Sequence, residues 1–432
     1  MKHKLFQFIV LATVSILASC GNDPEITLPK TESYDESNEL YSKESKLIAK
    51  AIKAQGLFYA NNSRASKECA SVCHYVVGES RTTAAADTVL SVVNFADNGG
   101  FVILTDKADS PEILAVSDRG HLDVGNIDNP SLKSFVAGTV AALSGRSKGG
   151  TPLDPTRPFL YEIEHTYDTV YNVMPMIQVQ WGQSVPYNNF TPRVGLRKTP
   201  AGCAPIAAAQ IMTHYRYPNY FLWDVDDTPR TIILDWDDIN RHVSSGTLTS
   251  LNNCFDNTET THETIGRLVR ELGKKMNTIY EINDAYTSFG GLKSALEGYG
   301  YTVSPVTVFA GSNKQVSFDG SSIWILLGHA ENENGIPYNH FFIVDGRKYI
   351  RYHRYSYIAD PSYTPPMIIE VVENTYGYDD YIHINWGWDG SSNGYFYNGT
   401  YNSANPHSLD VPDAKKGIYN FTEMLSYITV SR

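Results

Sequence analysis

Residues 202–212 read Gly-Cys-Ala-Pro-Ile-Ala-Ala-Ala-Gln-Ile-Met, which predicts a helix that begins beside Cys203. Pro205 fits the first turn of a helix, where its missing N–H costs nothing. The unpaired N–H groups and the macrodipole of a helix N-terminus favour negative charge. A thiolate at Cys203 is therefore expected to be stabilised and nucleophilic near neutral pH. The alanines let this helix pack closely against the element that carries a base. The alternative is a buried structural cysteine.

A cysteine nucleophile needs a base, and two histidines compete for that role. His340 starts the apolar strand 340–344, before a turn at Asp345-Gly346, whereas His329 lies between an apolar strand and a polar loop. A strand held in a sheet positions an imidazole better than a mobile loop does, so we favour His340.

The base also needs an orienting group, and the tetrahedral intermediate needs a donor for its oxyanion. Asn385 ends a strand and can accept the imidazole N–H without adding charge, and Trp386 can cover that hydrogen bond from water. His383 is expected to face away from Asn385 and to be structural. Upstream, the side-chain N–H of Gln183 and the backbone N–H of Cys203 would make a two-donor oxyanion hole.

Four segments in this order resemble the streptopain family of papain-like bacterial cysteine peptidases: residues 181–188, 202–212, 340–346 and 383–390. The resemblance implies an α+β fold in which a helical part carries the cysteine and an antiparallel β part carries the histidine. It makes Cys203 the nucleophile, His340 the base, Asn385 and Trp386 the orienting pair, and Gln183 an oxyanion donor. It also implies a zymogen whose prodomain packs on the active site and is removed by cleavage. The pair Ala204-Pro205 departs from the Val-Ala usual in the family.

The N-terminus predicts export. A basic start and an apolar run at 5–17 precede Leu17-Ala18-Ser19-Cys20, as in a signal peptide with a small-residue cleavage site. Cys20 resembles the lipidated cysteine of bacterial lipoproteins; the alternative is an ordinary secretory signal. We therefore expect residues 1–20 to be a signal peptide. The protein would be anchored by lipid at the bacterial outer membrane or cell surface, or released.

The amino-acid composition excludes several classes of protein. The net charge of −12 argues against a nucleic-acid binder, which would need a basic face. The five cysteines give no disulfide framework. Cys69 and Cys73, followed by His74, form a bridge, bind a metal or stay free, although their spacing is poor for zinc. We expect no metal and no cofactor.

Residues 21–45 are acidic and polar and predict a flexible tether, followed by a small α+β prodomain at 46–150. Its expected elements are an amphipathic helix at 46–60, strands at 88–94, 100–104 and 113–117, and a helix at 130–143. The stretch 144–155 is rich in Gly, Pro and charge and predicts an exposed boundary. The candidate activation cleavage sites are Arg146, Lys148 and Arg157, with a mature start within 147–172.

The peptidase domain is expected to span 151–432, with helices first and an antiparallel sheet afterwards. Beyond the Cys203 helix, the expected elements are a polar and acidic insertion around 219–260, helices at 262–277 and 292–298, and strands at 323–327, 340–344, 367–372 and 381–385. The expected activity is that of a cysteine endopeptidase that hydrolyses protein or peptide substrates through a thioester, with its own prodomain as inhibitor. Two alternatives remain: a catalytically inactive surface-binding lipoprotein of the same fold, and an acyltransferase or transglutaminase that uses the same residues.

Overall fold

A computed structural model describes residues 34–59, 68–77, 87–107, 110–123, 127, 130–143, 159–224, 229–244, 258–309, 316–331, 337–360, 367–398 and 426–432. The expected signal peptide with Cys20, residues 21–33 of the expected tether, the boundary stretch 144–155 and the three candidate cleavage sites lie outside these ranges. Within the described residues, no helix combines the length and the apolar character that crossing a membrane requires.

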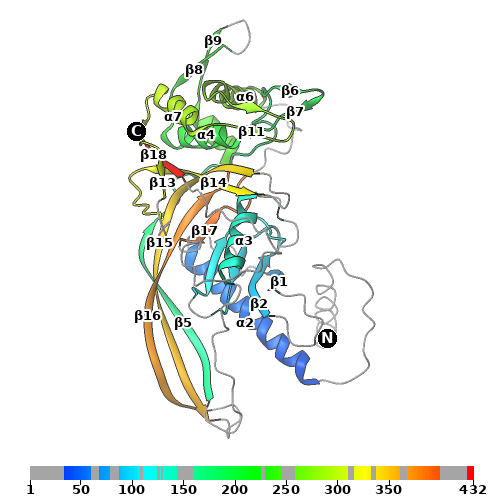
Figure 1. The fold of residues 1–432 in the computed structure, drawn as a ribbon, viewed down its shortest axis with the longest axis vertical. Coiled ribbons are helices and arrows are strands. Elements are labelled where there is room, and N and C mark those ends of the chain that lie inside the picture. Colours follow the sequence, from blue (N-terminus) through cyan, green and yellow to red (C-terminus); the bar gives the residue numbers. More distant parts are fainter. Residues whose placement is uncertain are drawn as a thin grey trace.

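The N-terminal unit is a four-stranded antiparallel meander with two helices (Figure 1). Its elements are α2 (Tyr34–Phe58), β1 (Cys69–Val77), β2 (Asp87–Phe95), β3 (Phe101–Leu104), β4 (Ile113–Ser117) and α3 (Pro130–Leu143). The three predicted strands and the helix at 130–143 are all present. The expected tether at 21–45 is wrong from Tyr34 onward, because α2 already begins there. Acidic residues suit a first helical turn, so a polar composition did not separate a solvated helix from a spacer. No disulfide joins Cys69 to Cys73.

The helical part of the second unit carries Cys203 and packs at one end of the molecule (Figure 1). Its helices are α4 (Cys203–Tyr215), α5 (Trp236–Ser244), α6 (Thr258–Lys275) and α7 (Phe289–Gly298). Around them lie the short hairpins β6 (Arg193–Val194) with β7 (Arg197–Lys198), β8 (Tyr220–Trp223) with β9 (Arg230–Ile233), and β10 (Ile279–Tyr280) with β11 (Ala285–Tyr286). The expected polar insertion at 219–260 therefore contains a hairpin and a helix.

The β part is antiparallel and carries His340, which confirms the predicted α+β class. Its strands are β5 (Phe159–Val173), β12 (Thr302–Val303), β13 (Thr307–Val308), β14 (Ile323–Glu331), β15 (Pro337–Asp360), β16 (Met367–Asn385), β17 (Gly394–Tyr397) and β18 (Ser426–Ser431). The strands predicted at 367–372 and 381–385 are both parts of β16. The turn expected at Asp345-Gly346 is instead a bulge inside β15. Residues 159–172, which fall in the expected window for the mature start, are paired with β15 as β5.

One sheet of twelve strands joins the two units, in the order β1-β2-β3-β4-β17-β16-β15-β14-β18-β12, with β5 on β15 and β13 on β18. One face of this sheet packs against α4 at one end and against α2 at the other. The opposite face packs against α3 and is called the α3 face. Because side chains alternate along a strand, neighbouring residues of β15 and β16 point to different faces.

Candidate active site

Cys203 is the first residue of α4, as predicted, and it is half-buried. Gly202 caps the helix with φ 96°, a conformation that favours glycine. A Cβ at this position would also lie 3.2 Å from the Cβ of Ala285. The residues that follow, from Ala204 to Thr213, are buried, because the small side chains let α4 pack closely against the core. Close packing around the helix mouth therefore fixes the position of the thiol.

Burial raises the pKa of Cys203 to about 11, and the charge of Asp284 acts in the same direction. The backbone N–H of Phe341 in β15 lowers this pKa, as do those of Ala204 and Cys203 at the helix N-terminus. Together they do not offset the loss of water. The expected stabilised thiolate is therefore not found in this state of the molecule. The thiol is protonated at neutral pH.

Gln183 lies beside the helix mouth. Its Oε1 accepts a hydrogen bond of 2.8 Å from the N–H of Gly202, and its backbone carbonyl accepts one of 3.0 Å from Ala201. The carboxamide is thus held one residue from Cys203, and its NH₂ group is still available as a donor. The structure brings together these two predicted residues.

His340 lies on the α3 face. Its ring centroid is 6.4 Å from that of Phe342 and 6.2 Å from that of Trp388, and both of those residues belong to the core beneath α3. The next residue, Phe341, points the other way and packs on Phe289 of α7. The sheet therefore separates the His340 side chain from Cys203, and the structure does not bring the predicted base to the nucleophile.

His340 is buried, and its Nε2–H donates a 2.9 Å hydrogen bond to the carbonyl oxygen of Trp386. Burial lowers the pKa of His340 to about 4, although the Trp386 carbonyl raises it in part. The imidazole is therefore neutral. The competing histidine, His329, lies on β14 in register with Asn339, next to the His340 position.

Asn385 does not contact His340. Its Nδ2 donates to the carbonyl of Val179 at 3.4 Å, and its Oδ1 accepts from the N–H of Gly387 at 3.1 Å. Trp386 lies on the α3 face, where its Nε1–H donates to Ser392. The orienting contact to His340 thus comes from the backbone of Trp386 rather than from the Asn385 side chain.

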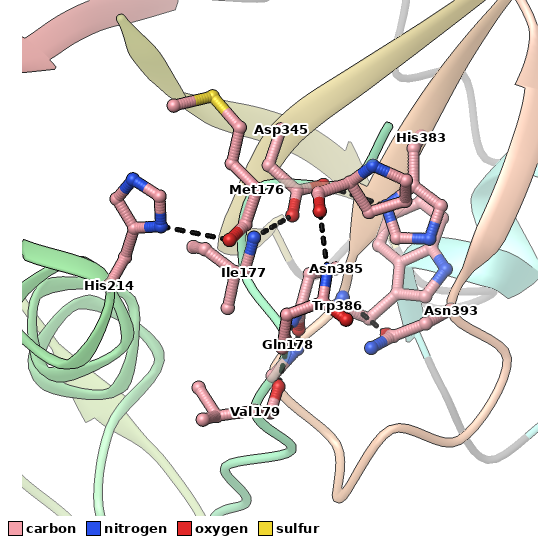
Figure 2. Close-up of polar contacts among 12 residues, drawn as sticks. Met176, Ile177, Gln178, Val179, His214, Asp345, His383, Asn385, Trp386 and Asn393 are labelled. Carbon is pink, nitrogen blue, oxygen red and sulfur yellow. Dashed lines mark hydrogen bonds and ion pairs between the residues drawn. The ribbon is translucent and has the colours of Figure 1, made fainter. Parts of the chain in front are cut away.

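A buried pair of side chains, Asp345 and His383, lies next to Asn385 (Figure 2). Nδ1 of His383 donates to Oδ1 of Asp345 at 2.7 Å. The expectation that His383 faces away from Asn385 is wrong, because residues two apart on a strand share a face. Asp345 lies at the bulge of β15 rather than in the expected turn, and this bulge places its carboxylate toward His383.

Two curated proteins resemble this chain in sequence. The thiol protease/hemagglutinin PrtT of Porphyromonas gingivalis is 23% identical over 351 residues, which cover 75% of this chain and 35% of that protein. Streptopain of Streptococcus pyogenes serotype M1 is 23% identical over 334 residues, covering 69% of this chain and 71% of streptopain. The chain thus spans only about a third of the first of these relatives.

Among solved structures, Prevotella intermedia prointerpain A superposes with a TM-score of 0.46 at 17% identity, over 83% of this chain and 98% of that one. The Peptidase C10 family model matches residues 181–396, half of this chain, and the matched range includes Gln183, Cys203, His340 and Asn385. The chain belongs to the Peptidase C10 family.

Proposed function

We propose that this protein is an exported cysteine endopeptidase, made as a zymogen, with Cys203 as its nucleophile. One observation carries the proposal: the N–H of Gly202 donates a 2.8 Å hydrogen bond to Oε1 of Gln183. Its amide NH₂ and the backbone N–H of Cys203 are then two donors beside one thiol, which is the arrangement that stabilises an oxyanion. Membership of the C10 family supports the same chemistry.

The reaction follows from these groups. His340 takes the proton of Cys203, and the sulfur attacks the scissile carbonyl carbon while Gln183 and the Cys203 N–H bind the oxyanion. His340 then gives the proton to the leaving amine as the C–N bond breaks, which leaves a thioester on Cys203. A water molecule, deprotonated by His340, attacks the thioester and releases the acid and the free thiol. The carbonyl of Trp386 holds the imidazole; Asn385 would do so only once the His340 side chain lies on its face of the sheet.

The zymogen proposal rests on the state of the two reacting groups. A thiolate–imidazolium pair requires a thiol pKa below that of the imidazole, whereas burial sets the two pKa values near 11 and near 4. Removal of the N-terminal unit would expose the α3 face, and the part of β15 that carries His340 would then have to turn this side chain to the face of the sheet on which Cys203 lies. We place the activating cut at Arg146, Lys148 or Arg157, and the lipid anchor at Cys20.

The decisive experiment replaces Cys203 by Ala in the full chain. Cys203→Ala is expected to abolish casein hydrolysis, self-processing and labelling by a thiol-directed peptidase inhibitor. Cys69→Ala, a matched change of another half-buried cysteine, is expected to preserve all three. Casein hydrolysis by Cys203→Ala would refute the proposal. Cross-linked rather than shortened casein from the unaltered chain would point to acyl transfer.

A further inference from the structure

Two ionisable side chains outside the predicted catalytic set are buried where the helical part meets the sheet (Figure 2). Asp345 of β15 is 0% exposed and His383 of β16 is 8% exposed. Their 2.7 Å contact joins Nδ1 of the ring to Oδ1 of the carboxylate. A carboxylate is costly to bury unless hydrogen bonds and a counter-group satisfy it, so such a pair requires a reason.

The pair binds the backbone of residues 174–180. These residues lead from β5 into the helical part and are called the crossover segment. The second oxygen of Asp345, Oδ2, accepts the N–H of Ile177 at 2.8 Å. The backbone carbonyl of Asp345 accepts the N–H of Met176 at 2.9 Å. Asp345 therefore fixes two successive peptide groups, and His383 holds the carboxylate in the orientation that does so.

The same segment is held from the side of the nucleophile. His214, in the last turn of α4, donates from Nδ1 to the carbonyl of Met176 at 2.8 Å. Three residues after the segment ends, Gln183 bonds to Gly202. The crossover segment thus connects the strand that carries His340, the helix that begins with Cys203, and the oxyanion donor.

We propose that Asp345 and His383 are a positioning pair that sets Gln183 and the Cys203 helix against the sheet. Neither residue touches substrate; both act through the crossover segment. The inference rests on the proposed peptidase function. A displacement of about 1 Å at reacting groups costs roughly a hundredfold in rate, so loosening this anchor lowers turnover more than substrate binding.

The test compares variants of the full chain after activation, with kcat expressed per thiol titrated by a covalent inhibitor. Asp345→Asn keeps the acceptor for Ile177 but removes the charge, and it is expected to lower kcat about tenfold to a hundredfold with KM changed less than about twofold. Asp380→Asn is the matched control. It removes a carboxylate from the same sheet, one that binds Arg347 and Asn398 rather than the crossover segment. Its kcat per thiol is expected to stay unchanged.

A second pair of variants tests the hydrogen bond itself. His383→Asn retains a donor near the position of Nδ1, whereas His383→Ala removes it, so the Asn variant is expected to recover turnover that the Ala variant loses. Wild-type kcat per thiol in Asp345→Asn, or equal losses in both His383 variants, would overturn the inference. Absence of hydrolysis by the unaltered activated chain would instead count against the proposed function.

Discussion

At the scale of single residues, loss of water contact determines the protonation states of Cys203 and His340. The helix N-terminus acts on Cys203 in the expected direction, but its N–H groups compete with burial of the sulfur, and burial dominates. The same holds for His340, whose neutral form is favoured by burial on the α3 face. Two residues with the right chemistry are thus both kept in their uncharged forms.

The pH dependence of thiol alkylation checks this state. The thiolate is the reactive form, and its population falls tenfold for each pH unit below the pKa. With a pKa of about 11, Cys203 of the uncleaved chain should react slowly with iodoacetamide at pH 7 and progressively faster as the pH rises toward 11. Mass spectrometry of the peptide that contains Cys203 measures the rate separately from the other cysteines. A rate at pH 7 equal to the plateau rate would contradict the prediction.

At the scale of elements, α2 is held by a lysine of the other unit. Lys348 of β15 is buried, and its ammonium donates to the carbonyls of Leu57 and Phe58, at the C-terminal end of α2. Unpaired carbonyls and a partial negative charge at a helix C-terminus make this a favourable place for a cation. The Nζ atom also lies 5.2 Å from the Phe58 ring.

Lys348→Met should therefore loosen α2. The change keeps the side-chain volume but leaves two carbonyls without their donor, which costs about 1–3 kcal/mol. Faster hydrogen exchange in α2 is the expected outcome, with a lower midpoint of thermal unfolding. Lys53→Met makes the same substitution at an exposed position of α2, where side-chain contacts contribute little, and should change both much less than Lys348→Met does. Equal exchange rates in the two variants would show that the contact contributes nothing.

The elements that the sequence predicts correctly are those determined by local residue patterns. The helix at 130–143 and the strands β2, β3 and β4 are set by short-range periodicity and turn residues, and they form as expected. The juxtaposition of Gln183 and Cys203 was also expected, and the hydrogen bond from the N–H of Gly202 to Gln183 holds the two residues close together. The face of His340 does not follow, since a shift of one residue in register sends every side chain of a strand to the other face. The bulge at Asp345 hid the pair with His383 for the same reason.

At the scale of the whole molecule, the N-terminal unit is part of the peptidase sheet rather than a lid over it. β4 pairs with β17, with Ser117 opposite Gly394. Oγ of Ser117 donates to the carbonyl of Asn393 at 2.6 Å, and the hydroxyl of Tyr381 donates to the carbonyl of Ile113 at 2.8 Å. Two of the three apolar cores contain residues of both units. Obligate interfaces resemble a domain core cut in two, and this one has that character.

Cleavage of the connecting segment alone should therefore leave the two fragments together. Trypsin at Arg146, Lys148 or Arg157 in the Cys203→Ala chain, which cannot process itself, should give two bands on a denaturing gel but one peak in size-exclusion chromatography. Gly394→Val is the matched disruption, because even a Cβ at Gly394 would overlap the carbonyl oxygen of Val116. That variant should release the N-terminal fragment after the same cut. Separate elution of the fragments from the nicked parent would mean that the shared sheet does not retain the unit. If they stay together, the proposed activation requires a second event that separates β4 from β17.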